Sequence, residues 1–325
     1  MQRLSLPARA LSRGIRHSSS GNGLPGNRLP KLRSLLRECK DDRVIRVMET
    51  HNGLTGLIAE TATATRADGE VVEFDGFWSS SLTASAAHGK PDIETVDTTA
   101  RLRLVEETLA VTTKPLIYDA DTGGHAKVFA FTVQTLERLG ASMAIIEDKT
   151  GLKQNSLFGT DRKQQLEDIP TFQGKIAAGQ AAKRDADFMI TARLEALIAG
   201  YGEAEALKRA EAFIEAGADS IMIHSKEKDP AEVLSFLDGY HKLPTTVPVV
   251  VVPTTYNVLT EKDLHEAGAS ICIYANQMLR AAYPSMVECV TSILEHGRSQ
   301  EIDSKLLSVK EILVLIDEGA GKGKA

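Results

Sequence analysis

The chain has 325 residues, of which 42% are hydrophobic and 25% are charged, and its mean hydropathy is −0.14. These values are typical of a globular protein and exclude a fibrous or fully disordered one. The net charge is −6, and because the basic residues before the first acid, Glu38, offset part of the negative charge, the remainder is more acidic still. Such a body argues against a nucleic-acid partner. The apolar runs are far shorter than the ~20 residues of a membrane span, which argues against a membrane protein.

The first 30 residues contain no acid and are rich in Arg and Ser. Arg9, Arg13 and Arg16 share one helical face, opposite Leu4 and Leu11. The pattern is typical of a mitochondrial presequence followed by a linker, and it predicts a mitochondrial matrix location. The alternative is a basic tail without import function, on a cytoplasmic protein. We expect the folded part to span residues 31–318, with a flexible tail at 319–325.

The three cysteines are Cys39, Cys272 and Cys289. They form no C-x-x-C pair, so neither a disulfide scaffold nor a structural zinc site is predicted. A reducing compartment is the natural expectation.

Short apolar runs alternate with longer segments of helical periodicity from residue 44 onward. We predict strands at residues 44–49, 71–79, 115–121, 143–148, 188–193, 220–224, 249–253 and 270–275. Helices are predicted at 128–139, 204–216 and 229–242, with Gly140, Gly217 and Gly268 at helix ends. This repeat fits an α/β fold, a closed (β/α)8 barrel of the TIM type. A doubly wound open sheet is the alternative, but no nucleotide-binding glycine motif follows any of these strands.

Two helices are expected after the eighth strand. One covers residues 285–296, and the other opens with Ser308 and Glu311 in capping-box spacing. A barrel needs one helix at this point, so we expect the last helix to take part in a subunit contact.

Polar residues end several predicted strands, and in such barrels the active site lies at the carboxyl ends of the strands. Asp119 and Asp121 end the third strand on one face, because side chains alternate along a strand, and Glu147 ends the fourth. Converging carboxylates without Cys or His ligands predict a Mg²⁺ site, with Mn²⁺ also suitable. The alternative is that these acids cap loops or pair with lysines.

Arg193 and His224 end the fifth and sixth strands, and an arginine there suits an anionic substrate. Arg193 could instead neutralise Glu195 or Glu147, and His224 could be a structural histidine. The small-residue loop at 78–82 offers N–H groups to an anion. The polar segment at 150–159, with glycines near both ends, predicts a lid over the site, with an inert surface loop as the alternative.

Taken together, these segments resemble the phosphoenolpyruvate mutases of the isocitrate lyase superfamily, from about residue 40 to 316. The segments that carry the resemblance are Trp78-Ser79-Ser80-Ser81-Leu82, Asp119-Ala120-Asp121-Thr122-Gly123, Glu147-Asp148-Lys149 with Lys153 and Asn155-Ser156-Leu157, Ala192-Arg193-x-Glu195, and His224-Ser225-Lys226.

The resemblance implies an isomerase that interconverts phosphoenolpyruvate and phosphonopyruvate, the first step of phosphonate biosynthesis. It implies a metal ion held directly by Asp119 and through water by Asp121, Glu147 and Asp92. It implies that the substrate carboxylate is held by Ser80, Ser81, Leu82 and Arg193, and the phosphoryl group by Asn155, Arg193 and His224. Trp78 would form one wall of the site for the enolate, and Lys153, Ser156 and Leu157 would belong to the gating loop. Asp92 would act as a nucleophile or as an orienting group.

Two positions depart from the family pattern. Gly124-His125-Ala126 follows Gly123 where many members have Tyr-Gly-Asn, and Ser81 stands where a glycine is familiar.

Three other functions are compatible with parts of this pattern. Phosphonopyruvate hydrolases resemble the same barrel but tend to carry Thr where this chain has Asn155. The lyases for 2-methylisocitrate and the oxaloacetate-cleaving relatives have a lid cysteine, which this chain lacks. A barrel without catalytic function would be expected to have lost some of the polar residues named above.

The resemblance also implies a homodimer or homotetramer with exchanged C-terminal helices. Because the product with a carbon–phosphorus bond is expected to be disfavoured, a phosphonopyruvate decarboxylase is the expected functional partner.

Overall fold

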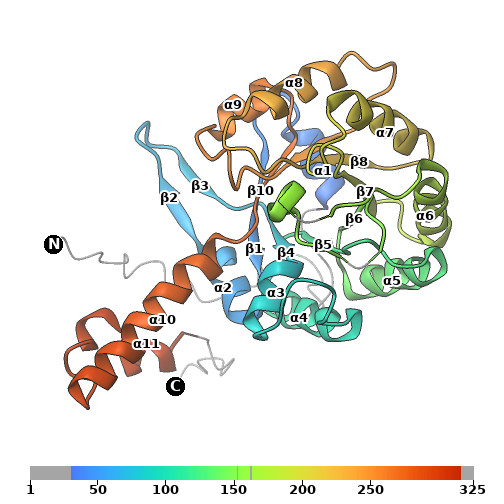
Figure 1. The fold of residues 1–325 in the computed structure, drawn as a ribbon. Coiled ribbons are helices and arrows are strands. Elements are labelled where there is room, and N and C mark those ends of the chain that lie inside the picture. Colours follow the sequence, from blue (N-terminus) through green and yellow to red (C-terminus); the bar gives the residue numbers. More distant parts are fainter. Residues whose placement is uncertain (1–30, 152, 162, 316–325) are drawn as a thin grey trace, which may run out of the picture.

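The computed structural model describes residues 31–315 except residues 152 and 162. The predicted presequence at 1–30 and the predicted tail at 319–325 lie outside the described residues. Figure 1 shows a barrel of strands surrounded by helices, with a helical arm and a β-hairpin extending from the same side.

The barrel closes through parallel pairing of its first and last strands, in the order β1-β10-β9-β8-β7-β6-β5-β4. Its strands are β1 (Ile45–Thr50), β4 (Gly76–Ser79), β5 (Leu116–Asp119), β6 (Met143–Glu147), β7 (Met189–Leu194), β8 (Ser220–Ile223), β9 (Val249–Val251) and β10 (Ile271–Tyr274). Almost every residue in these strands is buried, as expected of a sheet covered on both faces. The predicted closed barrel is confirmed, and the open sheet is wrong.

The helices pack around the barrel or extend from it. They are α1 (Leu32–Glu38), α2 (Gly53–Thr61), α3 (Ser81–Ala87), α4 (Thr98–Ala110), α5 (Ala126–Leu139), α6 (Ile169–Ala182), α7 (Glu203–Glu215), α8 (Ala231–Tyr240), α9 (Glu261–Glu266), α10 (Gln277–His296) and α11 (Val309–Leu313). Short 3-10 helices lie at Ser156–Asp161 and Asp303–Lys305. The helices predicted at 128–139, 204–216 and 229–242 are confirmed. Gly140 ends α5 in the left-handed conformation, with φ 90°.

The strand predicted at 71–79 is wrong as a single element. Residues Val71–Glu73 form β3, which pairs with β2 (Thr63–Thr65) in an antiparallel hairpin outside the barrel. The barrel strand β4 begins only at Gly76. Asp75 separates the two, because its carboxylate accepts hydrogen bonds from Arg46 N and from the Arg43 guanidinium. The apolar run therefore serves two different sheets.

Two hydrophobic cores hold the fold together. One lies between the strands and the helices around them. The other fills the barrel, and Leu32, Leu35 and Leu36 of α1 pack against it. Arg33 fixes α1 there by donating to the backbone oxygen of Ala186, just before β7. Because α1 covers the amino-terminal end of the barrel, the carboxyl ends of the strands remain for a site.

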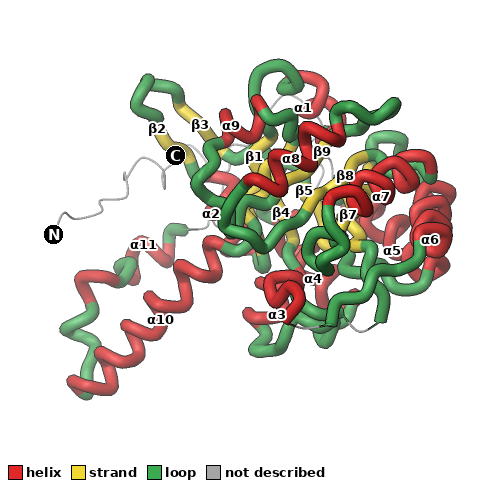
Figure 2. The backbone as a smooth tube through the Cα atoms, turned by 45° about the horizontal axis from the view of Figure 1, so that its top comes forward, coloured by secondary structure: helices red, strands yellow, loops and turns green. Residues whose placement is uncertain are grey.

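The C-terminal helices form an arm that leaves the barrel (Figure 2). Helix α10 starts earlier than the predicted 285–296, since it continues through Pro284 although proline lacks the N–H of a helix interior. It has no buried residue. The capping box at α11 is confirmed, with Ser308 Oγ accepting from Glu311 N at 3.2 Å. Within the described residues, no helix is both long and apolar enough to span a membrane.

Candidate active site

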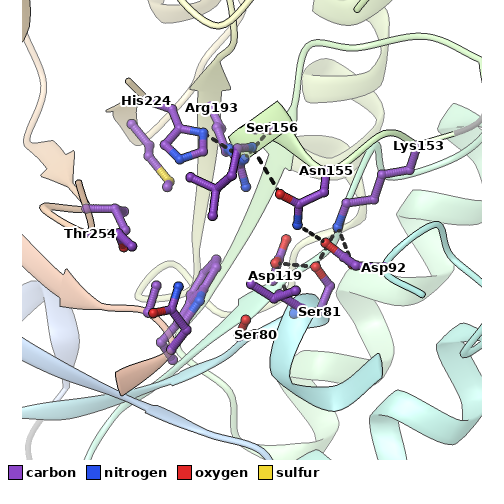
Figure 3. Close-up of a pocket in the computed structure, with 17 residues that line it drawn as sticks. Ser80, Ser81, Asp92, Asp119, Lys153, Asn155, Ser156, Arg193, His224 and Thr254 are labelled. Atoms are coloured by element: carbon purple, nitrogen blue, oxygen red, sulfur yellow. Dashed lines mark hydrogen bonds and ion pairs between the residues drawn. The ribbon is translucent and has the colours of Figure 1, made fainter. Parts of the chain in front are cut away.

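A cavity of about 60 Å³ lies at the carboxyl ends of the barrel strands (Figure 3). The sequence-predicted residues that line it are Trp78, Ser80, Ser81, Leu82, Asp92, Asp119, Lys153, Asn155, Ser156, Leu157, Arg193 and His224. Residues far apart in the sequence are therefore gathered at the expected end of the barrel. Asp121 and Glu147 do not line the cavity, although both lie next to residues that do.

Asp119 of β5, with Asp92 and Asp121 near it, forms one side of the site. Ser81, the first residue of α3, donates to Asp119 Oδ2 from its backbone N at 3.1 Å and from its hydroxyl at 2.7 Å. Lys153 Nζ donates to Ser81 Oγ at 2.5 Å, to Asp92 Oδ1 at 3.1 Å, and to Asp121 Oδ1. Its buried ammonium therefore lies among the acids that were predicted to bind a metal. Asn155 Nδ2 adds a 2.7 Å bond to the other oxygen of Asp92.

The predicted convergence of Asp119, Asp121 and Glu147 into one cluster is not found: among the residues with described positions, no group of three acidic, His or Cys side chains is arranged to hold a metal ion. Asp121 is not on the strand face that the alternation predicted. Strand β5 ends at Asp119, and Asp121 follows it with a left-handed φ of 53°. Its side chain turns to Lys153 and to Arg101 of α4.

Glu147, at the end of β6, is level with Arg193 of β7 in the strand register. It is 1% exposed and forms ion pairs with Lys149 at 3.3 Å and Arg193 at 3.4 Å. Within the described part of the chain, neither of its carboxylate oxygens has a hydrogen-bond partner. A buried carboxylate with unmet acceptor capacity is suited to the water ligands of a hard cation. The acids are thus of the chemical type that suits a Mg²⁺ ion, with Asp119 and Asp92 at the cavity, although their side chains do not converge on one point among the described residues.

The opposite side of the site is a network centred on Glu195. Its Oε1 accepts from Arg193 Nε at 2.5 Å and lies 2.9 Å from His224 Nδ1, while its Oε2 accepts from the Ser156 hydroxyl at 2.6 Å. Arg193 also donates to Ser156 Oγ at 2.8 Å. The alternative pairing of Arg193 with Glu195 is thus present, and the same arginine also lines the cavity. The network holds both Arg193 and His224 in place.

The described residues of the polar segment predicted as a lid contact the site. Lys149 Nζ donates to the backbone oxygen of Gln154 at 2.8 Å and to Ser156 Oγ at 2.9 Å. Gly151 and Gly159 near its two ends have φ of 80° and 50°, values that favour glycine. Lys153 and Ser156 are buried by this arrangement. Lys153, Asn155, Ser156 and Leu157 of this segment therefore form part of the cavity lining.

Burial and neighbouring charges set the protonation of the site. Burial raises the pKa of Glu147 to about 7, against the opposing effect of Lys149. For Asp119, burial acts in the same direction but is outweighed by Lys153 and Arg101, so its pKa is lowered. Burial and the charge of Arg193 lower the pKa of His224, which favours its neutral imidazole. The site thus combines an ionised Asp119 with a neutral histidine.

Five further residues line the cavity that the sequence analysis did not select. They are Met222, Val252, Thr254, Ala275 and Asn276. Thr254 and Asn276 directly follow the predicted strands 249–253 and 270–275, so the strand-end rule could have found them. Glu195 was predicted only as a possible partner of Arg193, and Lys149 belongs to a motif without a predicted role of its own.

The family described as phosphoenolpyruvate phosphomutase matches residues 33–294 of this chain. The chain belongs to this family. The phosphoenolpyruvate phosphomutase family includes members with different activities. A phosphonopyruvate hydrolase from Variovorax sp. (strain Pal2) is 40% identical over 289 residues, covering 88% of this chain and 95% of the relative. A phosphoenolpyruvate phosphomutase from Tetrahymena pyriformis is 37% identical over 273 residues, covering 84% and 86%.

Solved structures of the family share the fold. A phosphoenolpyruvate phosphomutase from Streptomyces platensis subsp. rosaceus superposes with a TM-score of 0.79 at 38% identity, covering 87% of this chain and 93% of that one. A phosphonopyruvate hydrolase in complex with oxalate and Mg²⁺ superposes with a TM-score of 0.76 at 39% identity, with the same coverage. Membership in an enzyme family with a (β/α)8 barrel is therefore established.

Proposed function

We propose that this chain is a phosphoenolpyruvate mutase, which moves a phosphoryl group between the enol oxygen of phosphoenolpyruvate and the methylene carbon of the same molecule. The observation that carries the proposal is the position of Asn155, which lines a small cavity together with Arg193 and His224. In the reaction one P–O bond is broken and one P–C bond is formed, so no atom is gained or lost. Water must be kept from the phosphoryl group throughout.

Arg193, His224 and Asn155 would grip the oxygens of the moving phosphoryl group. Glu195 fixes the orientation of Arg193 and His224, so both are held before substrate arrives. Phosphoryl transfer depends mainly on positioning and on neutralising charge, which a prearranged guanidinium and amide supply. No acid or base of unusual strength is required.

The carboxylate of the substrate would be bound at the start of α3, by Ser80, Ser81 and Leu82. Ser81 and Leu82, the first residues of helix α3, line the cavity, but the N–H of Ser81 is donated to Asp119 in this structure. Its predicted role as a carboxylate donor therefore requires that this bond be shared or exchanged.

A divalent cation at Asp119, with Asp92, Asp121 and Glu147 nearby, would stabilise negative charge on the enolate oxygen of pyruvate. The family supports this assignment, since the hydrolase noted above was solved with Mg²⁺. Two features of this chain also support a metal ion here. The carboxylate oxygens of Glu147 lack hydrogen-bond partners among the described residues, and the Lys153 ammonium lies beside Asp92, where acids attract positive charge.

Hydrolysis of phosphonopyruvate is the second candidate, because the Variovorax hydrolase is 40% identical to this chain. The hydrolase branch is expected to carry Thr where this chain carries Asn155, so the asparagine favours the mutase. The alternative of a lyase has less support, since none of the three cysteines lines the cavity.

Phosphorus NMR of residues 31–325 with phosphonopyruvate and Mg²⁺ tests the proposal, because it separates carbon-bound, ester and free phosphate. Growth of the phosphoenolpyruvate signal supports a mutase. Growth of inorganic phosphate instead would show a hydrolase, and Asn155→Thr serves as the matched variant, expected to increase the fraction of inorganic phosphate.

The physiological setting is part of the proposal. A phosphonopyruvate decarboxylase would drain the product, and net phosphonate formation in a reconstituted assay without such an enzyme would contradict this.

Residues 1–30 would direct the protein to mitochondria. A fluorescent protein carrying residues 1–30 should enter the organelle, and a fusion with Arg9, Arg13 and Arg16 changed to Ser should not.

A further inference from the structure

Arg101 of α4 lies behind the site, at a position that neither the motifs nor the strand-end rule select. Its side chain is buried, and its guanidinium lies over the ring of Tyr118 at 4.6 Å from the centroid. Nη1 donates to Asp121 Oδ2 at 2.5 Å and Nη2 donates to the backbone oxygen of Ser79 at 3.4 Å. One side chain thus bridges the ends of β4 and β5.

Asp121 needs such support because its backbone is strained. Its φ of 53° is uncommon for a residue other than glycine. Its backbone N donates to Asp119 Oδ1 at 3.2 Å, and its backbone oxygen accepts from Glu147 N at 2.8 Å. Asp121 therefore connects the two other acids that were predicted to serve a metal ion.

The side chain of Asp121 is held from two directions. Arg101 donates a hydrogen bond to Oδ2, and Lys153 donates one to Oδ1. Because Lys153 comes from the gating loop and Arg101 from a barrel helix, only the Arg101 contact is independent of the loop. Arg101 thus holds the plane and direction of the Asp121 carboxylate independently of the loop.

We propose that Arg101 is a positioning residue for the reaction, which fixes the Asp121 carboxylate and the Ser79 end of β4 in one geometry. The Ser79 contact matters because Ser80 and Ser81, at the cavity, follow directly in the chain. The arginine fork spans both contacts, which a lysine ammonium would not reproduce. The kinetic part of this proposal rests on the proposed function.

A second pocket makes the proposal testable by chemical rescue. A pocket of about 230 Å³ is lined by Arg101, Tyr118 and Asp121 on one side and by the exposed Asp97 and Gly124 on another. A Cβ built on Gly124 would meet no atom within 4 Å, so the space beside it is open. Removing the Arg101 side chain would join its volume to this pocket, and free guanidinium from solvent could then enter.

The experiment compares Arg101→Ala with Arg103→Ala, which removes an exposed arginine two positions along the same helix. At a temperature where circular dichroism shows both variants folded, we expect Arg101→Ala to lose about 10–100-fold in kcat, the range typical of residues that orient metal ligands, with KM changed less than about threefold. Millimolar guanidinium should restore at least part of kcat in Arg101→Ala, whereas KCl at the same ionic strength should not. Arg103→Ala should match the wild type and show no rescue.

A metal-free measurement accompanies the kinetics. In EDTA, guanidinium should raise the melting temperature of Arg101→Ala and should not raise that of the wild type or Arg103→Ala. Should Arg101→Ala not fold, Arg101→Lys replaces it. Its kcat should fall because the Ser79 contact is lost. Guanidinium should not rescue it, because the lysine side chain fills the space that the arginine left.

The proposal is overturned by a wild-type kcat in folded Arg101→Ala or Arg101→Lys, or by the absence of any guanidinium response in Arg101→Ala. Failure of the proposed function would instead appear in the wild-type protein, as no phosphoenolpyruvate formed from phosphonopyruvate. In that case the guanidinium-dependent rise in the melting temperature of Arg101→Ala in EDTA still tests whether Arg101 holds Asp121 and the end of β4.

Discussion

Asn155 and Asp92 lie 63 residues apart in the chain and are joined by a 2.7 Å hydrogen bond from Asn155 Nδ2 to Asp92 Oδ2. The Asn155 Oδ1 atom accepts from Leu157 N at 3.0 Å, which fixes the amide orientation. One residue of the gating loop thus connects the loop to the acidic side of the cavity. The Asn155 amide that is proposed to hold the phosphoryl group thus also links the gating loop to Asp92.

Asn155→Ala should abolish mutase turnover, because it removes both the phosphoryl grip and the contact with Asp92. Mg²⁺ binding should stay intact, since Asn155 is not among the proposed ligands. Phosphorus NMR measures the turnover, and isothermal titration calorimetry measures the binding. Gln165→Ala, which removes an exposed amide beyond the same loop, is the control and should behave as wild type. Near-normal turnover in Asn155→Ala would remove the basis for the proposed grip.

Glu147→Gln should weaken the metal dependence. The amide keeps the shape of the side chain but removes the charge and one acceptor of a buried group, so the Mg²⁺ concentration for half-maximal activity should rise about tenfold or more. The measurement is a Mg²⁺ titration of initial rates, with the exposed Glu215→Gln as control. An unchanged titration would argue against a role for Glu147 near the metal ion.

Lys153→Met should destabilise the metal-free protein. Asp92 and Asp121 would keep their buried charges without the ammonium that now balances them, and breaking a buried ion pair costs about 3–5 kcal/mol. Urea denaturation in EDTA measures the loss, and Mg²⁺ should recover part of it by supplying the missing positive charge. Lys163→Met, which removes an exposed lysine just beyond the same loop, is the matched control. Equal stability of Lys153→Met and wild type in EDTA would show that the ammonium is not needed there.

The C-terminal arm should mediate assembly into a dimer or tetramer. Val290 and Leu294 of α10 are 56% and 83% exposed, and an apolar surface of this kind on an extended helix is typical of an interface. Light scattering after size-exclusion chromatography should give the mass of an oligomer for the wild type and of a monomer for Val290→Asp with Leu294→Asp. Phe131→Asp on α5, where the side chain is 72% exposed, is the control. A monomeric wild type would contradict this expectation.

The sequence by itself determined the barrel and most of the cavity. Alternating apolar strands and helices predict a parallel sheet, eight such units favour its closure into a barrel, and the carboxyl ends of the strands meet at one face in either case. Asp119, Arg193 and His224 could therefore be placed at the site from strand ends alone, because local periodicity and chain topology decide them.

The tertiary structure decided what depends on contacts between distant segments. The apolar run at 71–79 is divided between a hairpin and the barrel by the Asp75 contacts with Arg43 and Arg46. Asp121 leaves the strand face because its left-handed backbone turns it toward Arg101 and Lys153. No periodicity marks Arg101, because the sequence pattern of the first turn of α4 is the same whether or not a carboxylate lies against that side chain. Such pairings form only when helix and strand pack together, so no local sequence pattern predicts them.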